Sequence, residues 1–227
     1  MTTIILVRHG ETDWNKQQVF RGRIDVPLNS VGLEQARATG EALGNYKIDA
    51  IYSSPLSRAM ETARAVGTFH PNISIKEAEG FIDIDFGKWQ GMPHDKVREE
   101  YKKLYDRWQR EPHNVKMPDG ESLDEVKLRS MGALNDILAR HENEIVAIAS
   151  HRVVNKVIIC AILGLTNQHF WCIRQDTCAI NIFDSSERGF IVSVINDTCH
   201  IKALADSANR ADFSVVPIQK YPKFPPP

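Results

Sequence analysis

Short β-branched runs alternate with amphipathic stretches along this chain. The runs have the length of single strands, and the stretches between them carry apolar residues at helical spacing. The predicted strands are residues 4–7, 49–52, 145–149, 179–183 and 190–195, and the predicted helices are residues 32–43, 56–66 and 152–163. Strands that alternate with helices are typical of an α/β protein with a largely parallel sheet. A short polar segment joins the last two strands, which predicts a hairpin.

Two segments do not fit this alternation. Residues 92–125 are charged and aromatic, with Tyr101, Tyr105 and Trp108 at helical spacing, so we expect a helical insertion whose aromatic side chains pack. Residues 207–227 are rich in proline and predict a tail rather than a helix or central strand. We therefore expect one domain over residues 1–206. Its predicted fold is a three-layer α/β/α sandwich with a mostly parallel central sheet and a small helical insertion over the active site.

Composition narrows the classes of function. The chain has 227 residues, 42% of them hydrophobic, and a formal net charge of -1. A near-neutral balance argues against a protein that binds nucleic acid or a membrane surface. The start of the chain lacks the pattern of a secretory signal, and the four cysteines lack the paired spacing of a zinc site. We expect a cytoplasmic protein with reduced thiols.

Three predicted strands end in cationic or titratable side chains. Arg8 and His9 end the first strand, Arg58 opens the helix after the second, and His151 follows the strand at residues 145–149. The carboxyl ends of parallel strands meet at one edge of a sheet, where ligands bind. Arg21 lies in the loop after the first strand. Guanidinium groups and the first turn of a helix both suit an anion, so this pattern predicts a site for a phosphoryl group.

The same residues carry a family resemblance. Residues 8–12 read R-H-G-E-T, residues 53–63 read S-S-P-L-S-R-A-M-E-T-A, and Ser150-His151 follow later in the chain. In order and spacing, together with Asn15, they resemble the histidine phosphatase superfamily. The resemblance covers about residues 3 to 200. It is closest to the branch of the cofactor-dependent phosphoglycerate mutases and the alpha-ribazole phosphatases.

The resemblance implies a role for each matching residue. His9 would be the nucleophile that takes the phosphoryl group, and Arg8, Arg58 and His151 would surround its equatorial oxygens. The residues expected to bind substrate are Asn15, Arg21, Gly22 and Arg152. Guanidinium and imidazolium groups would supply the positive charge, so we expect no metal ion and no cofactor.

The proton donor is less settled. The family usually has a glutamate four residues before the glycine of an F-G-x-W-E-G segment, and Asp83 stands at that position here, with Gln90 where a second glutamate is common. An aspartate is one methylene shorter, so its reach must come from the backbone or a water molecule. Asp83 is the preferred acid, and Glu79 and Asp85 are the alternatives.

These observations favour a phosphomonoester hydrolase that acts on a small phosphorylated metabolite. A phosphoglycerate-type mutase is the alternative, although the segment after Gly91 is shorter than the insertion that closes the site of those mutases. A protein that binds a phosphorylated ligand without turnover is the second alternative. The substrate stays open, and so does the choice between monomer and homodimer. Five further histidines have no metal-ligand spacing and are interpreted as solvated or structural: His70, His94, His113, His141 and His169.

Overall fold

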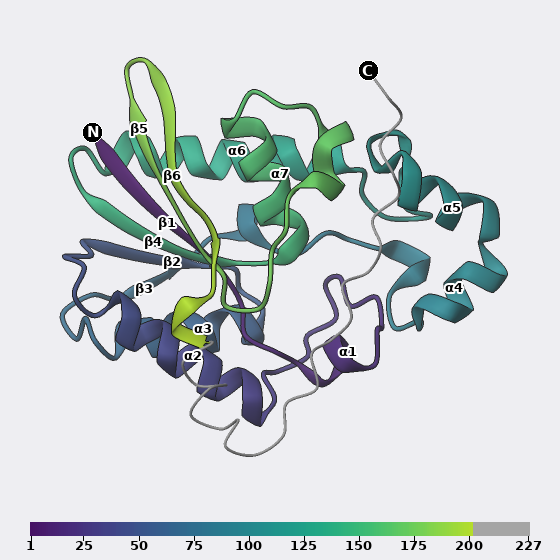
Figure 1. Cartoon of the computed structure of the whole chain (residues 1–227), viewed down its shortest axis with the longest axis horizontal. Coiled ribbons are helices and arrows are strands. Elements are labelled where there is room, and N and C mark those ends of the chain that lie inside the picture. Colours follow the sequence, from purple (N-terminus) through teal and green to yellow (C-terminus); the bar gives the residue numbers. More distant parts are fainter. Residues whose placement is uncertain (202–227) are drawn as a thin grey trace.

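The computed structural model describes residues 1–201, and within them six strands form one sheet in the order β3-β2-β4-β1-β5-β6 (Figure 1). The strands are β1 Thr2–Arg8, β2 Ala50–Ser53, β3 Ile75–Glu77, β4 Ile145–Ser150, β5 Ile180–Ser186 and β6 Gly189–Asp197. The first four pair in parallel, while β5 runs antiparallel to both β1 and β6. The mostly parallel sheet and the hairpin are confirmed, and β3, which is short and lies at an edge, is an addition.

Helices cover both faces of the sheet (Figure 1). The α-helices are α1 Asp13–Lys16, α2 Ser30–Leu43, α3 Ser57–Gly67, α4 His94–Glu100, α5 Lys102–Arg110, α6 Leu123–Arg140 and α7 Arg152–Ile162. The 3-10 helices are η1 Glu79–Phe81, η2 Gly87–Trp89, η3 Pro112–Asn114 and η4 Asn167–Cys172. α2 and α3 lie on one face, and α6 and α7 lie on the other.

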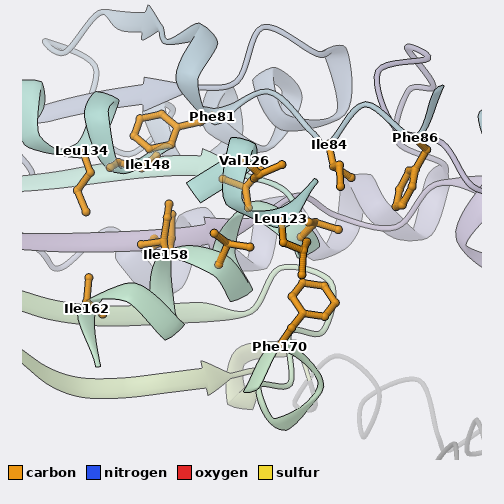
Figure 2. Close-up of a cluster of buried hydrophobic side chains, with 14 of the residues drawn as sticks. Phe81, Ile84, Phe86, Leu123, Val126, Leu134, Ile148, Ile158, Ile162 and Phe170 are labelled. Carbon is orange, nitrogen blue, oxygen red and sulfur yellow. The ribbon is translucent and has the colours of Figure 1, made fainter. Parts of the chain in front are cut away.

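Alternate residues of β1 divide the core between these faces. Ile4 and Leu6 pack in the cluster that includes side chains of α6 and α7, part of which Figure 2 shows. Ile5 and Val7 pack in a second cluster with side chains of α2 and α3. A strand places successive side chains on opposite faces, and the central strands are buried on both. The predicted three-layer sandwich is therefore confirmed.

The predicted insertion is helical, as expected. α4 and α5 lie beyond one end of the sheet (Figure 1). Tyr101 and Tyr105 lie against Trp89, and Trp108 is buried, so these aromatic side chains pack as predicted. The predicted tail, residues 207–227, and the domain boundary at residue 206 lie outside the described residues. Within the described part of the chain, no helix is long and apolar enough to cross a membrane.

The loop after β1 is pressed against the start of α2. Glu11 accepts a hydrogen bond at its carbonyl from the Asn29 amide at 3.0 Å, and its own amide donates to Gln35 at 2.9 Å. At Gly32 a Cβ would overlap the carbonyl oxygen of Glu11, and at Gly10 it would lie 2.5 Å from the carbonyl oxygen of Gly32. Two glycines thus allow helix and loop to touch, and this contact fixes the segment that follows β1.

We predict that Gly32→Ala forces this loop away from α2. Overpacking of this kind costs about 1–3 kcal/mol in the free energy of unfolding. Gly132→Ala in α6 is the matched control, because a Cβ there meets nothing within 4 Å. Alanine favours a helix interior by up to about 1 kcal/mol over glycine, so the control should be neutral or stabilising. Urea unfolding curves measure both, and equal effects of the two substitutions would contradict the packing argument.

Candidate active site

His9 lies directly after β1 and is fully buried. Its backbone amide donates to the carbonyl oxygen of Ser150 at 2.9 Å, which ties it to the end of β4. Its ring Nδ1 lies 2.6 Å from the carbonyl oxygen of Gly10. A carbonyl only accepts, so Nδ1 carries the proton and Nε2 keeps its lone pair. This Nε2 is buried and has no hydrogen-bond partner among the described residues.

His151 comes from the end of β4 and is also fully buried. Its ring centre lies 5.2 Å from that of His9. Its Nε2 lies 2.7 Å from the hydroxyl of Ser54, which fixes the ring from the side of β2. Two of the predicted strand ends thus place their imidazoles next to each other.

Both imidazoles are neutral in the resting site. Burial lowers the pKa of His9 well below its usual value, and the positive charges nearby, that of Arg58 first, lower it further. The pKa of His151 is lowered for the same reasons. Desolvation disfavours the charged ring, so neither imidazole supplies positive charge in the resting site. The positive charge comes from guanidinium groups.

Those guanidinium groups are held by backbone carbonyls. Arg58 is fully buried and donates to the carbonyl oxygens of Gly22 at 2.7 Å and Ile24 at 3.0 Å. Arg8 donates to the carbonyl oxygen of Gln175 at 2.7 Å. Burial, followed by the charges of Arg152 and Arg21, lowers the pKa of Arg8 to about 9, which leaves it charged at neutral pH. The site therefore holds fixed cations that favour a bound anion.

Asp83 is the one buried carboxylate among the described residues, at 5% exposure. Its Oδ2 lies 3.2 Å from Arg58 and 3.7 Å from Nδ1 of His151, and its Oδ1 accepts from the amide of Ile84 at 2.9 Å. The two alternative acids lie elsewhere. Glu79 is exposed, and Asp85 accepts from the amide of Gly87 at 2.8 Å. The structure brings Asp83, and neither alternative, into contact with the cluster.

Comparison with known proteins agrees with this site. Residues 4–198 match the family model of the histidine phosphatase superfamily, branch 1. The chain belongs to the histidine phosphatase superfamily. It is 35% identical over 211 residues to phosphoserine phosphatase 1 of Hydrogenobacter thermophilus, which covers 93% of this chain and 100% of that protein. It is 30% identical over 206 residues to the metal-independent phosphoserine phosphatase of Arabidopsis thaliana, which covers 90% of this chain and 85% of that protein.

A solved structure confirms the fold of this histidine phosphatase. Bacillus stearothermophilus YhfR superposes with a TM-score of 0.85 at 33% identity, over 88% of this chain and 100% of that one. The predicted fold class and the predicted phosphatase family are therefore confirmed.

The residues expected to bind substrate fall into two groups. Arg21, Gly22 and Arg152 line a pocket together with Asp83. Gly22 has a φ of 54°, and a Cβ there would lie 2.8 Å from the carbonyl oxygen of Ile84, so the position requires glycine. Its carbonyl is thereby aimed at Arg58.

Asn15 differs from these three residues, because its side chain contacts the backbone and side chain of Thr12 in the loop after β1. Its side-chain oxygen accepts from the amide of Thr12 at 2.9 Å and lies 3.0 Å from the hydroxyl of Thr12. Arg21 donates to that same hydroxyl at 3.1 Å. In this structure Asn15 therefore orients the loop that carries Arg21.

Sequence reasoning did not identify two residues, Gln175 and Asn155, that support the histidine phosphatase site. Gln175 supplies the carbonyl that holds Arg8, and it comes from a segment without any periodic pattern. Asn155 is fully buried in α7. With its amide oriented so that donors meet acceptors, it donates to the carbonyl oxygen of His151 at 3.2 Å and accepts from the amide of Arg8 at 3.3 Å. A lone polar residue in an apolar helix was the only signal for it.

From the sequence, His94 was interpreted as solvated or structural. In the structure it lies in α4 and also lines the pocket beside Arg21. The other histidines without metal-ligand spacing stay outside this pocket. Within the described residues, no group of three or more histidine, cysteine, aspartate or glutamate side chains is arranged to hold a metal ion.

We predict that the stability of this histidine phosphatase falls as the pH drops from 7 to 5. The folded-state pKa values of His9 and His151 lie below the ordinary 6.5, so the unfolded chain binds protons there that the folded chain does not. Each such group removes up to about 1.4 kcal/mol of stability per pH unit below the unfolded pKa. Urea unfolding at several pH values should show a shallower slope for His9→Gln. His169→Gln, outside the buried cluster, should reproduce the wild-type slope, and an unchanged slope for His9→Gln would refute the assignment.

Proposed function

We propose that this histidine phosphatase hydrolyses a small phosphomonoester through a phosphohistidine at His9. One observation carries the proposal: the lone pair on Nε2 of a neutral, buried His9 has no partner and lies within the field of Arg8, Arg21 and Arg58. A neutral imidazole is a nucleophile, and fixed guanidinium groups stabilise the charge that develops on phosphoryl oxygens. The arrangement combines both requirements.

In the first step Nε2 of His9 attacks phosphorus and the ester P–O bond breaks. The leaving alkoxide takes a proton from Asp83 and departs as the alcohol. The phosphorylated ring is now cationic, and its remaining N–H donates to the carbonyl oxygen of Gly10, the contact already made at 2.6 Å. Arg8, Arg58 and His151 would contact the equatorial oxygens during the transfer.

In the second step water attacks the phosphohistidine. Asp83, now a carboxylate, takes the proton from that water, the P–N bond breaks, and its electron pair returns to Nε2. Inorganic phosphate leaves, and the site regains its starting protonation state. Asp83 thus acts as the acid in its protonated form in the first step and as the base in its carboxylate form in the second. Its contacts with Arg58 and His151 hold it in the cluster in both steps.

The proposed reaction needs no metal ion, because guanidinium groups supply the charge that a divalent cation would otherwise provide. A relative named as a metal-independent phosphatase supports this part of the proposal. Two relatives named as phosphatases align with 90% or more of this chain. Their names favour hydrolysis over the mutase alternative. The contact of Asp83 with the cluster favours turnover over simple ligand binding. The cytoplasmic location and the homodimer stay predictions.

We predict that a labelled phosphomonoester leaves acid-labile, base-stable label on His9. Rapid-quench mixing with a chelator present throughout measures it, since the mechanism uses no metal. His9→Ala should carry no label. His169→Ala is the matched control, because it removes a histidine outside the cluster, and it should label as the wild type does. Label on a serine, or activity that the chelator abolishes and magnesium restores, would overturn the mechanism.

Substitution of Asp83 tests its proposed role as the proton donor. Asp83→Asn should slow an alkyl phosphate by roughly 10²- to 10⁴-fold, the worth of a positioned general acid. It should slow para-nitrophenyl phosphate much less, because nitrophenolate leaves without a proton. Steady-state rates with both substrates give the ratio that isolates proton donation from the loss of the Arg58 contact.

Asp85→Asn is the control for this measurement. It removes a neighbouring carboxylate that stabilises the turn at Gly87. It should lower both rates equally or not at all. If the ratio shifts in Asp85→Asn and stays constant in Asp83→Asn, Asp85 is the acid and the assignment of Asp83 is wrong.

A further inference from the structure

A pocket lined by aromatic side chains adjoins the cationic cluster. Its lining residues are Val19, Phe20, Arg21, Gly22, Asp83, Phe86, His94, Trp108, Arg152, Val153, Phe170 and Trp171. We call it the aromatic pocket. It shares Arg21, Gly22 and Asp83 with the proposed site of phosphoryl transfer, so the organic part of a bound ester would enter it. Phe86 and Phe170, labelled in Figure 2, belong both to its lining and to the main core cluster.

The aromatic rings of the pocket brace one another. His94 stacks on Phe20, with ring centres 4.1 Å apart and planes 13° from parallel. Trp171 packs edge to face on Phe170 at 4.8 Å, and its indole N–H donates to the carbonyl oxygen of Trp108 at 2.9 Å. Walls held in this way are preorganised, and preorganised aromatic walls lose little entropy when they bind a flat apolar group.

The wall formed by His94 is uncharged. Burial, followed by the charges of Arg152 and Arg21, lowers the pKa of His94 to about 4. At neutral pH this ring therefore acts as an aromatic surface rather than as a cation.

The aromatic pocket is lined by two cationic side chains and one carboxylate. Arg21 and Arg152 line it, and the guanidinium carbon of Arg152 lies 5.9 Å from the ring centre of Trp171. Asp83 is the one carboxylate among the lining residues, and Arg58 and the amide of Ile84 already engage its oxygens. An ammonium group in this pocket would face the guanidinium groups of Arg21 and Arg152.

We propose that the aromatic pocket selects phosphomonoesters whose organic part is a flat apolar ring, neutral or anionic, and disfavours esters that carry an ammonium group. The proposal rests on the proposed function, because it assigns the leaving group of that same reaction.

Three primary alkyl phosphates test the proposal: 2-phenylethyl phosphate, propyl phosphate and phosphoethanolamine. Isothermal titration of the full-length His9→Ala variant measures their dissociation constants without turnover. We expect 2-phenylethyl phosphate to bind at least about tenfold more tightly than propyl phosphate, and phosphoethanolamine to bind most weakly. Equal affinities, or the tightest binding for phosphoethanolamine, would overturn the proposal.

A second pair of variants locates the selectivity. In the His9→Ala background, Trp171→Ala should reduce the ratio of phenylethyl to propyl affinity several-fold, because it removes one wall. Tyr46→Ala removes a partly exposed aromatic side chain that is not part of the pocket and should keep the ratio. If Tyr46→Ala lowers the ratio as much as Trp171→Ala does, the selectivity does not come from this pocket.

The affinity measurements and the phosphohistidine assay distinguish a failure of the pocket assignment from a failure of the proposed function. If the esters bind in the expected order and the wild type forms no phosphohistidine, the proposed function fails and the assignment of the pocket stands. If phosphohistidine forms and the order of affinities is absent, the assignment of the pocket fails and the proposed function stands.

Discussion

The structure depends on the burial of guanidinium groups around an uncharged imidazole. Cations removed from water need partners, and Asp83 is the one buried carboxylate near Arg58 and His151 in the described residues. Arg58 and Arg8 also donate to backbone carbonyl oxygens. Arg58 takes those of Gly22 and Ile24, and Arg8 takes that of Gln175. The segments at residues 22–24, 83 and 175 thus hold the guanidinium groups of Arg58 and Arg8 in place. A bound phosphoryl dianion would neutralise the positive charge of these groups.

The sheet supplies the geometry that this burial requires. β1 and β4 are adjacent and parallel, so Arg8 pairs with Ser150 in register and the next residues are the two buried histidines. β2 lies on the other side of β4, and its end brings Ser54 to His151. The hydrogen bonds of the sheet fix the strand ends, and the side-chain contacts with Gly10 and Ser54 then orient the two rings.

Much of this arrangement could be predicted from the sequence. The β-branched run before Arg8 and the one before Ser150 indicated buried strands, and the rule that parallel strand ends meet brought His9, Arg58 and His151 together. The family resemblance, through the glutamate that usually stands four residues before the glycine at Gly87, favoured Asp83 over Glu79 and Asp85. These signals are local, and each is read within a few residues of the side chain concerned.

The rest depends on contacts between distant segments. Gln175 holds Arg8 through a backbone carbonyl, which every residue type has, so no residue pattern marks it. The neutral state of His151 follows from burial among charges that come from several separate segments of the chain. His94 became part of a pocket wall because the insertion folds back over the loop that carries Phe20. Neither the spacing nor the composition of the sequence indicates a contact of this kind between distant segments.

The hydrogen bond from the His9 ring to the carbonyl of Gly10 joins neighbouring residues, so the tautomer of the nucleophile is set within one dipeptide. No distant side chain has to be retained for that purpose. Residues of the insertion and of η4 that form the aromatic pocket are therefore free to diverge without disturbing the attacking nitrogen. A fold built in this way lets evolution change which alcohol is released while the bond-breaking apparatus is inherited intact.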